Sequence, residues 1–130
     1  MKAYWDSSAL VEALGDIKLR TRLSQERGFT RTHALAEVFS ALTGGRLAIR
    51  LDPKAAAELI NTLVELDFVD LTAGEVISAL KEAQSRGVRG GRVHDFMHAK
   101  AAEKSGAKEL LTTDQYDFNS LTESVKVELV

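Results

Sequence analysis

The pattern of apolar and polar positions changes repeatedly between two periods along the chain. Short apolar runs rich in aromatic and β-branched residues are typical of strands; they occupy residues 2–5, 29–32, 68–72, 109–113 and 125–130. Longer stretches between them have apolar residues at helical spacing; they cover residues 6–14, 16–26, 33–45, 52–66, 73–87 and 93–106. The stretch 16–26 is predicted to continue the helix before it, up to Gly28.

This alternation of strands and helices predicts an α/β fold in three layers, with a central, mostly parallel sheet between two layers of helices. In such sheets, binding and catalytic sites form beyond the carboxyl ends of the strands. The residues that directly follow each predicted strand are therefore the first candidates for chemistry.

Composition narrows the class of protein. A chain of 130 residues with 45% hydrophobic and 28% charged residues is predicted to form one globular domain over residues 1–130. No apolar run is long enough to cross a bilayer, Asp6 comes too early for the core of a signal peptide, and cysteine is absent, so we expect a cytoplasmic protein without a membrane partner. The net charge of -2 excludes a strongly basic nucleic-acid binder, although 17 Lys and Arg residues leave room for a local basic face.

Acidic side chains recur at the predicted carboxyl edge of the sheet. Asp6 follows the first strand, Asp114 and Asp117 follow the strand 109–113, and Glu37 and Asp95 lie in the first turns of their helices. Each also has a structural interpretation, because Asp caps helices and favours turns and an exposed Glu can simply be solvated. If all five converge, they repel one another unless a cation neutralises them, and oxygen ligands without Cys favour magnesium (Mg2+) or manganese (Mn2+) over zinc.

Polar residues around these acids have two possible roles. Ser8 and Thr112 either hydrogen-bond a ligand or the attacking water, or serve as local caps. Arg89 and Arg92, in the glycine-containing basic loop Arg86 to Arg92, either hold substrate phosphates or belong to a solvated loop.

Other residues near the acids are predicted to be structural. His94 and His98 flank Asp95, and His98 shares a helical stripe with alanines, so we expect it to pack in the interior rather than transfer protons. Trp5 and Phe118 are predicted to belong to the core.

Three motifs resemble the PIN-domain family, in particular its VapC-type toxin ribonucleases. "WDSSALVEAL" resembles the family's first strand, aspartate and helix, and "HALAEVFSAL" resembles its second motif with Glu37 as the acid. "VHDFMHAKAAEKSGAKELLTTDQYDF" resembles its third region, where Asp95 opens the helix and Thr112, Asp114 and Asp117 close the site. Many relatives carry Asn at the position of Asp114.

The resemblance implies a PIN-like fold and hydrolysis of RNA phosphodiesters with magnesium bound by the five acids. It also implies the toxin of a type II toxin-antitoxin pair, held inactive by an antitoxin protein and forming a homodimer. The alternatives are a free-standing PIN nuclease that processes RNA, or a non-catalytic PIN-like scaffold that only binds a partner. Such a scaffold is expected to lose acidic positions, whereas this chain retains all five.

A phosphotransfer domain of the response-regulator kind also clusters aspartates beyond parallel strands. It fits less well, because this chain lacks the lysine expected after a late strand and Glu37 has no role in such a domain. RNA cleavage with added magnesium separates the enzyme from both non-nuclease classes.

Overall fold

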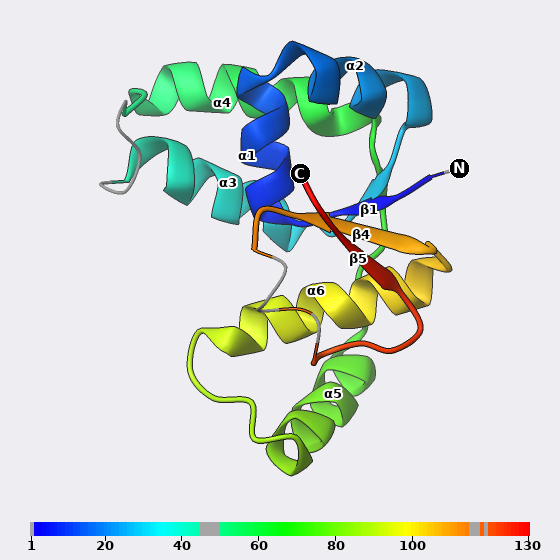
Figure 1. Cartoon of the computed structure of the whole chain (residues 1–130). Helices are drawn as coiled ribbons and strands as arrows, with labels where there is room; N and C mark the ends of the chain where they lie inside the picture. Colours follow the sequence, from blue (N-terminus) through cyan, green and yellow to red (C-terminus); the bar gives the residue numbers. More distant parts are fainter. Residues whose placement is uncertain (1, 45–49, 115–117, 119) are drawn as a thin grey trace.

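A parallel sheet forms the centre of the molecule in the computed structural model, which describes residues 2–44, 50–114, 118 and 120–130 (Figure 1). Its five strands lie in the order β3-β2-β1-β4-β5, and each neighbouring pair is parallel. The predicted α/β class and parallel sheet are therefore confirmed. The strands are β1 (Tyr4–Trp5), β2 (Phe29–Thr30), β3 (Asp67–Phe68), β4 (Glu109–Thr112) and β5 (Lys126–Leu129).

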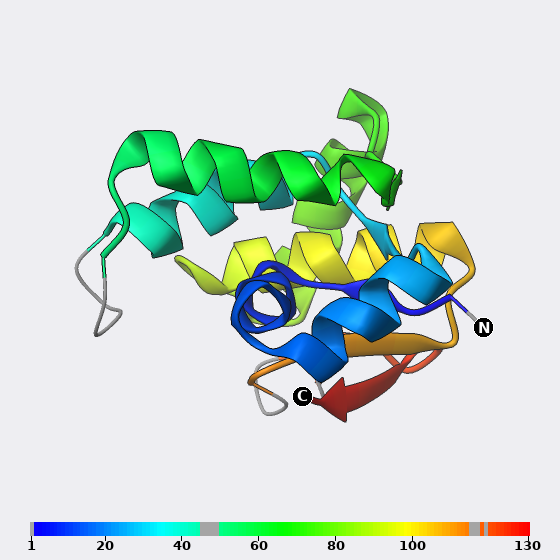
Figure 2. The same ribbon diagram turned by 90° about the horizontal axis from the view of Figure 1, so that it is seen from above.

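Helices cover both faces of this sheet. In Figure 1, the first four α-helices lie on one side and the last two on the other, and Figure 2 shows α3 and α4 running side by side. The helices are α1 (Ser7–Gly15), α2 (Ile17–Glu26), α3 (His33–Thr43), α4 (Pro53–Asn61), α5 (Ala73–Ser85) and α6 (Arg92–Ser105), with a 3-10 helix η1 (Thr62–Glu65) after α4.

Alternation along the central strands divides the core between the two faces. Tyr4 and Leu110 pack with α5 and α6, whereas the next residues along each strand, Trp5 and Leu111, pack with α1, α2 and α3. Successive side chains of a strand point to opposite faces, so two buried residues in a row require helices on both sides.

The predicted continuous helix from residue 6 to 26 is wrong, because Asp16 starts a new one. Its backbone is extended and its carboxylate accepts the N–H groups of Lys18 and Leu19 at 2.9 and 3.1 Å. A capping aspartate satisfies N–H groups that have no partner within the helix. Ile17, which follows Asp16, is 82% exposed, consistent with a helix start at the surface.

Two smaller expectations also needed correction. The segment predicted as a helix over residues 52–66 divides into α4 and η1, and the third strand is only two residues long and begins at Asp67. The buried stripe of α3 consists of Ala34, Val38 and Leu42, and the apolar Phe39 is 37% exposed. No helix within the described ranges is both long and apolar enough to cross a membrane.

Candidate active site

Asp6 lies where β1 ends and α1 begins. Its side chain is the N-cap of α1 and accepts hydrogen bonds from the Ala9 N–H at 2.8 Å and the Ser8 hydroxyl at 2.7 Å. The residue is only 4% exposed, although an aspartate that merely caps a helix is usually open to water. Its backbone N–H donates to the carbonyl of Leu111, which fixes Asp6 beside the end of β4.

The surroundings of Asp6 disfavour its charged form. Burial raises the pKa of the carboxyl group above its usual value, and the Thr112 hydroxyl, the Ala9 N–H, the charge of His98 and the Ser8 hydroxyl only partly oppose this. A carboxylate kept in such a place is destabilising unless a cation or another compensating group is bound.

The two predicted hydroxyl residues connect the ends of β1 and β4. The Ser8 hydroxyl donates to Asp6, and Ser8 Oγ lies 3.3 Å from Thr112 Oγ1. Ser8 Oγ also accepts the Thr113 N–H at 3.0 Å, and Thr112 Oγ1 accepts the Asp114 N–H at 3.1 Å. In this structure both hydroxyls bind protein groups around Asp6.

Glu37 reaches the same region from α3 through a buried pair of aromatic side chains. Its Oε1 lies 2.8 Å from His98 Nε2, and the other ring nitrogen, His98 Nδ1, lies 2.7 Å from the Tyr4 hydroxyl. His98 and Tyr4 are 1% and 0% exposed, whereas the Glu37 side chain is 23% exposed. The expected packing of His98 in the interior is confirmed, but its two hydrogen bonds were not foreseen.

The pKa of Glu37 shifts in the opposite direction to that of Asp6. Burial raises it, but the hydrogen bond from His98 and the charges of His98, His33 and His94 together bring the pKa below its usual value. Glu37 is therefore held in its charged form, partly exposed, close to histidine side chains.

Two further residues of this edge, His33 and Arg31, had no place in the prediction. His33 starts α3 and stacks on His94 of α6, with ring centroids 5.7 Å apart and an interplanar angle of 19°. Arg31 directly follows β2, and its buried Nε has no hydrogen-bond partner among the described residues. Their positions in the sequence could have indicated them, because a residue directly after a strand and the first residue of the next helix both lie at the expected carboxyl edge of the sheet.

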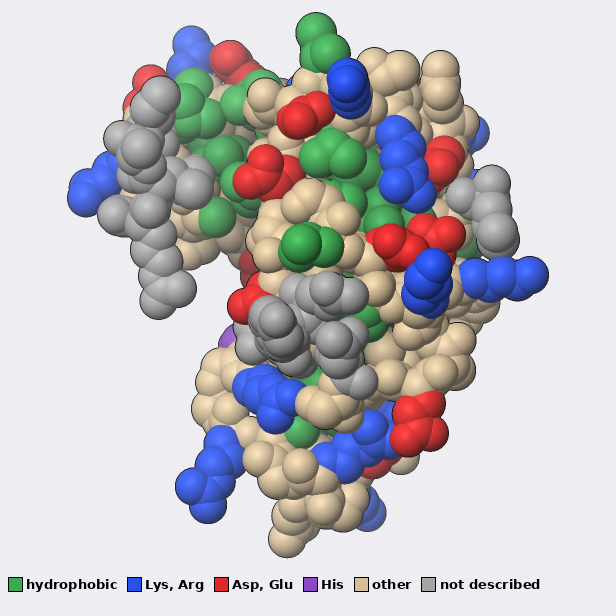
Figure 3. Space-filling model, viewed as in Figure 1, with side chains coloured by type: hydrophobic (Ala, Val, Ile, Leu, Met, Phe, Trp, Pro, Cys, Tyr) green, Lys and Arg blue, Asp and Glu red, His purple; other side chains and the backbone are tan. Residues whose placement is uncertain are grey.

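The remaining acids are less enclosed than Asp6. Asp95 is partly buried in the first turn of α6, three residues before His98 and therefore on a similar side of the helix. Asp114 is exposed just beyond β4, and Asp117 lies outside the described residues. Figure 3 shows a hollow between the α3–α4 side and the start of α6, with acidic side chains and a histidine at its edge.

The side chains at this edge offer the kind of oxygen ligands that divalent cations bind. Asp6 and Glu37 both neighbour the Tyr4–His98 pair, and carboxylate oxygens are the ligands that magnesium and manganese prefer. The raised pKa of Asp6 means that its negative charge is disfavoured, and a bound cation would stabilise that charge. Within residues 2–44, 50–114, 118 and 120–130, however, no three His, Asp or Glu side chains form a group that could hold one ion.

The basic loop is partly attached to the segment after β4. Arg86 Nη1 donates to the Ser120 carbonyl at 3.3 Å, and the Arg92 guanidinium donates to the Ser120 hydroxyl. Arg89 is exposed, and of the two predicted phosphate ligands Arg92 is the one bound to Ser120. Trp5 and Phe118 are both buried, as predicted for core residues.

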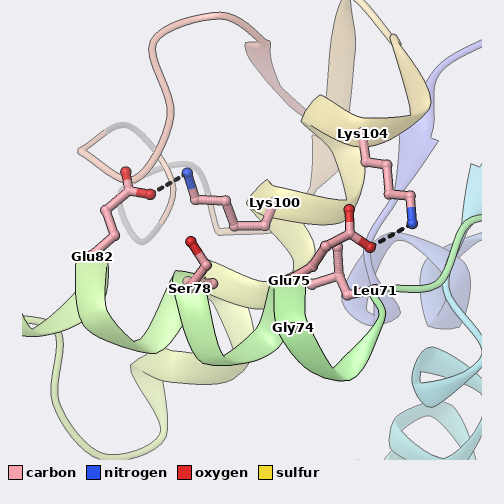
Figure 4. A pocket seen from close by; sticks show the side chains of 8 residues that line it. Leu71, Gly74, Glu75, Ser78, Glu82, Lys100 and Lys104 are labelled. Carbon is pink, nitrogen blue, oxygen red and sulfur yellow. Dashed lines mark hydrogen bonds and ion pairs between the residues drawn. The ribbon is translucent and has the colours of Figure 1, made fainter.

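A pocket of about 320 Å³ lies elsewhere, between α5 and α6 (Figure 4). Lys100 pairs with Glu82 and Lys104 pairs with Glu75, each at 2.6 Å, so its charges neutralise one another. Its α6 residues are in the second half of the helix, away from Asp95 in the first turn, and the pocket is not part of the acidic edge.

These features define a class of protein: a three-layer α/β/α domain with a parallel sheet whose carboxyl edge carries a buried aspartate. Residues 3–123 match the family model of the PIN domain, so the chain belongs to the PIN-domain family. PIN domains are in general metal-dependent nucleases, and the family therefore indicates a nuclease. No protein with a curated description matches the chain significantly.

Proposed function

We propose that this protein is a magnesium-dependent or manganese-dependent endoribonuclease that acts at the carboxyl edge of its sheet. The observation that carries the proposal is Asp6, a buried aspartate with a raised pKa at the end of β1 in a PIN domain. Helix capping alone needs no buried carboxylate, because Ser, Thr or Asn caps equally well.

The position of each residue at this edge suggests its role. Asp6, Glu37 and Asp95 would hold the cation, with Asp114 and Asp117 completing or flanking the site. Because the described side chains do not yet form a three-ligand group, binding would require them to move closer together. Ser8 and Thr112 would keep the Asp6 carboxylate oriented, and Arg89, with Arg92 if it leaves Ser120, would contact substrate phosphates. A bound magnesium or manganese ion would lower the pKa of a water molecule and neutralise charge on the phosphodiester.

Cleavage of single-stranded RNA tests the proposal. The wild type should cleave in magnesium or manganese and stop when chelator is added, and Asp6→Asn and Asp95→Asn should each lower kcat/KM by a hundredfold or more, on the order expected for loss of a metal ligand or essential carboxylate. Lys81→Gln, an exposed change on α5, serves as the matched control. Wild-type cleavage by Asp6→Asn with unchanged circular dichroism would overturn the assignment.

We further propose that the nuclease is the toxin of a type II toxin-antitoxin pair, with an antitoxin as partner, and that it forms a homodimer. The support is the resemblance of the three motifs to VapC-type toxins. Expression of the wild type alone should arrest growth of the host cell, and coexpression with the product of the neighbouring reading frame should restore it. Growth unaffected by an active nuclease would favour the free-standing RNA-processing enzyme, and absence of any cleavage would favour the partner-binding scaffold.

A further inference from the structure

A chain of two hydrogen bonds, the first buried and the second partly buried, connects the interior of the molecule to Glu37. It runs from Tyr4 on β1 through His98 on α6 to Glu37 on α3, with heavy-atom distances of 2.7 and 2.8 Å. The Tyr4 and His98 rings meet edge to face with centroids 5.7 Å apart at 67°, so both are also held by packing. The three residues come from three elements, and their positions follow from the packing of both helix layers on the sheet.

The direction of the hydrogen bond to Glu37 follows from the chemistry of its two ends. An ionised carboxylate can only accept, so His98 Nε2 must carry the proton that it donates to Glu37 Oε1. The other ring nitrogen, Nδ1, lies 2.7 Å from the Tyr4 hydroxyl, so the ring is hydrogen-bonded on both sides. Burial raises the pKa of Tyr4 well above its usual value, so this hydroxyl keeps its proton.

We propose that His98 and Tyr4 are positioning residues: Tyr4 holds the His98 ring through Nδ1, and His98 Nε2–H holds the Glu37 carboxylate in one orientation at the carboxyl edge. No other hydrogen bond to the Glu37 side chain is present in the described part of the chain. This inference deepens the proposed function and rests on it for the consequence that an oriented Glu37 binds the cation more tightly. Partners that orient metal ligands typically contribute 10-fold to 100-fold in metal affinity.

The first test needs neither metal nor substrate. Nitrogen-15 NMR of the histidine rings in the metal-free wild type should find a proton on His98 Nε2 that exchanges slowly with water, because it is held by Glu37. In Tyr4→Phe, which keeps the ring but removes the hydroxyl, this proton should remain but exchange faster, because the ring is then held from one side only. A His98 ring without a proton on Nε2, or equal exchange in the two proteins, would overturn the proposal.

The second test uses two variants that each retain one half of the imidazole. The amide N–H of His98→Gln occupies roughly the place of Nε2 and can still donate to Glu37, whereas the amide of His98→Asn reaches only toward Tyr4. Calorimetric titration with manganese should show affinity reduced about tenfold or more in His98→Asn and reduced less in His98→Gln. In RNA cleavage at saturating manganese, kcat should follow the same order while KM for RNA stays unchanged.

The outcomes separate this inference from the proposed function. Equal manganese affinity for His98→Asn, His98→Gln and the wild type, with all three folded by circular dichroism, would overturn the positioning role. A wild type that binds manganese but cleaves no RNA would overturn the proposed function and leave the positioning chain supported by the NMR and calorimetry. If neither variant folds, the exchange of the His98 Nε2 proton in the wild type and in Tyr4→Phe still decides.

Discussion

At the scale of single residues, Asp6 combines two roles with opposite effects on stability. As an N-cap it satisfies the Ala9 N–H and stabilises α1, but as a buried carboxylate it carries a charge that its surroundings disfavour. Asparagine caps about as well as aspartate and presents the same oxygen acceptor without the charge.

We therefore expect Asp6→Asn to be more stable than the wild type when metal is removed by chelator. The gain should be on the order of 1 kcal/mol, which for a chain of this length raises the melting temperature by about 3–5 °C. Asp6→Ala is the matched control, because it removes the charge and the cap together and should be about 1 kcal/mol less stable than Asp6→Asn. Asp6→Asn melting below the wild type in chelator would contradict the account of Asp6.

Asp6 and Glu37 should affect the pH dependence of stability with opposite signs. The pKa of Asp6 is raised, so its destabilising effect is present at neutral pH and disappears as pH falls through the raised folded-state pKa toward the unfolded value of about 3.9. The pKa of Glu37 is lowered, so its stabilising effect is present above the unfolded value of about 4.3 and is lost as pH falls through the lowered folded-state pKa.

Urea denaturation between about pH 3 and pH 7 in chelator measures how the free energy of unfolding depends on pH. Asp6→Asn should be more stable than the wild type at pH 7 and Glu37→Gln less stable, and both differences should shrink in acid. Two differences of the same sign at pH 7 would show that the two carboxyl groups do not occupy the opposed environments described above.

The sequence predicted Asp6 and Glu37 as candidates because Asp6 directly follows a strand and Glu37 lies in the first turns of the helix after β2. It did not reveal which acid is buried: the exposed Asp114 and the enclosed Asp6 both directly follow a strand. The Tyr4–His98–Glu37 chain joins residues 94 and 61 positions apart, and no local pattern encodes such a contact. His33 and Arg31 were missed although their positions, at the start of α3 and directly after β2, gave a local signal.

At the scale of elements, local signals predicted most helices and strands correctly, and the errors have local causes. The break between α1 and α2 depends on the Asp16 cap, which outweighs an apolar pattern that continues through it. Three of the strands, β1, β2 and β3, are only two residues long. Hydrophobic patterns locate such elements but do not fix their ends.

Asp16→Ala should destabilise the protein by about 1 kcal/mol through the loss of this cap. The residue is exposed, so little else changes, and Asp16→Asn should retain most of the stability because its side-chain oxygen can accept the same two N–H groups. Thermal melts of the two variants make the comparison. Equal stability of Asp16→Ala and the wild type would mean that α2 is held by packing alone.

Gly28 provides a second test at this scale, at the entrance to β2. A Cβ at this position would lie 2.5 Å from the Trp5 indole and 2.8 Å from the Ala3 carbonyl oxygen. Because Trp5 is fully buried and β1 is paired on both sides, neither neighbour can move easily. Gly28→Ala should therefore cost about 2 kcal/mol or more in urea denaturation, whereas Gly15→Ala, with nothing within 4 Å of its Cβ, should cost little.

At the scale of the whole molecule, the order of strands explains why acids that are distant in the sequence lie along one edge of the sheet. β1 lies at the centre between β2 and β4, so Asp6 after β1 and Asp114 after β4 emerge at this edge, and α3 after β2 carries Glu37 to His98. The alternation of strands and helices predicted the parallel sheet, but it did not determine the strand order. The shared edge was therefore an expectation from the class of fold, and the family match gives it a functional meaning.

The most direct measurement of the central claim, that this edge is a cation site, is a set of thermal melts of the wild type and Asp6→Asn in chelator and in excess magnesium. A cation that binds only the folded protein adds about 2.7 kcal/mol at a hundredfold excess over its Kd, and a variant without a ligand gains less. We predict that Asp6→Asn melts above the wild type in chelator and below it in magnesium. Equal responses of the two proteins to magnesium, or no response from either, would contradict the account.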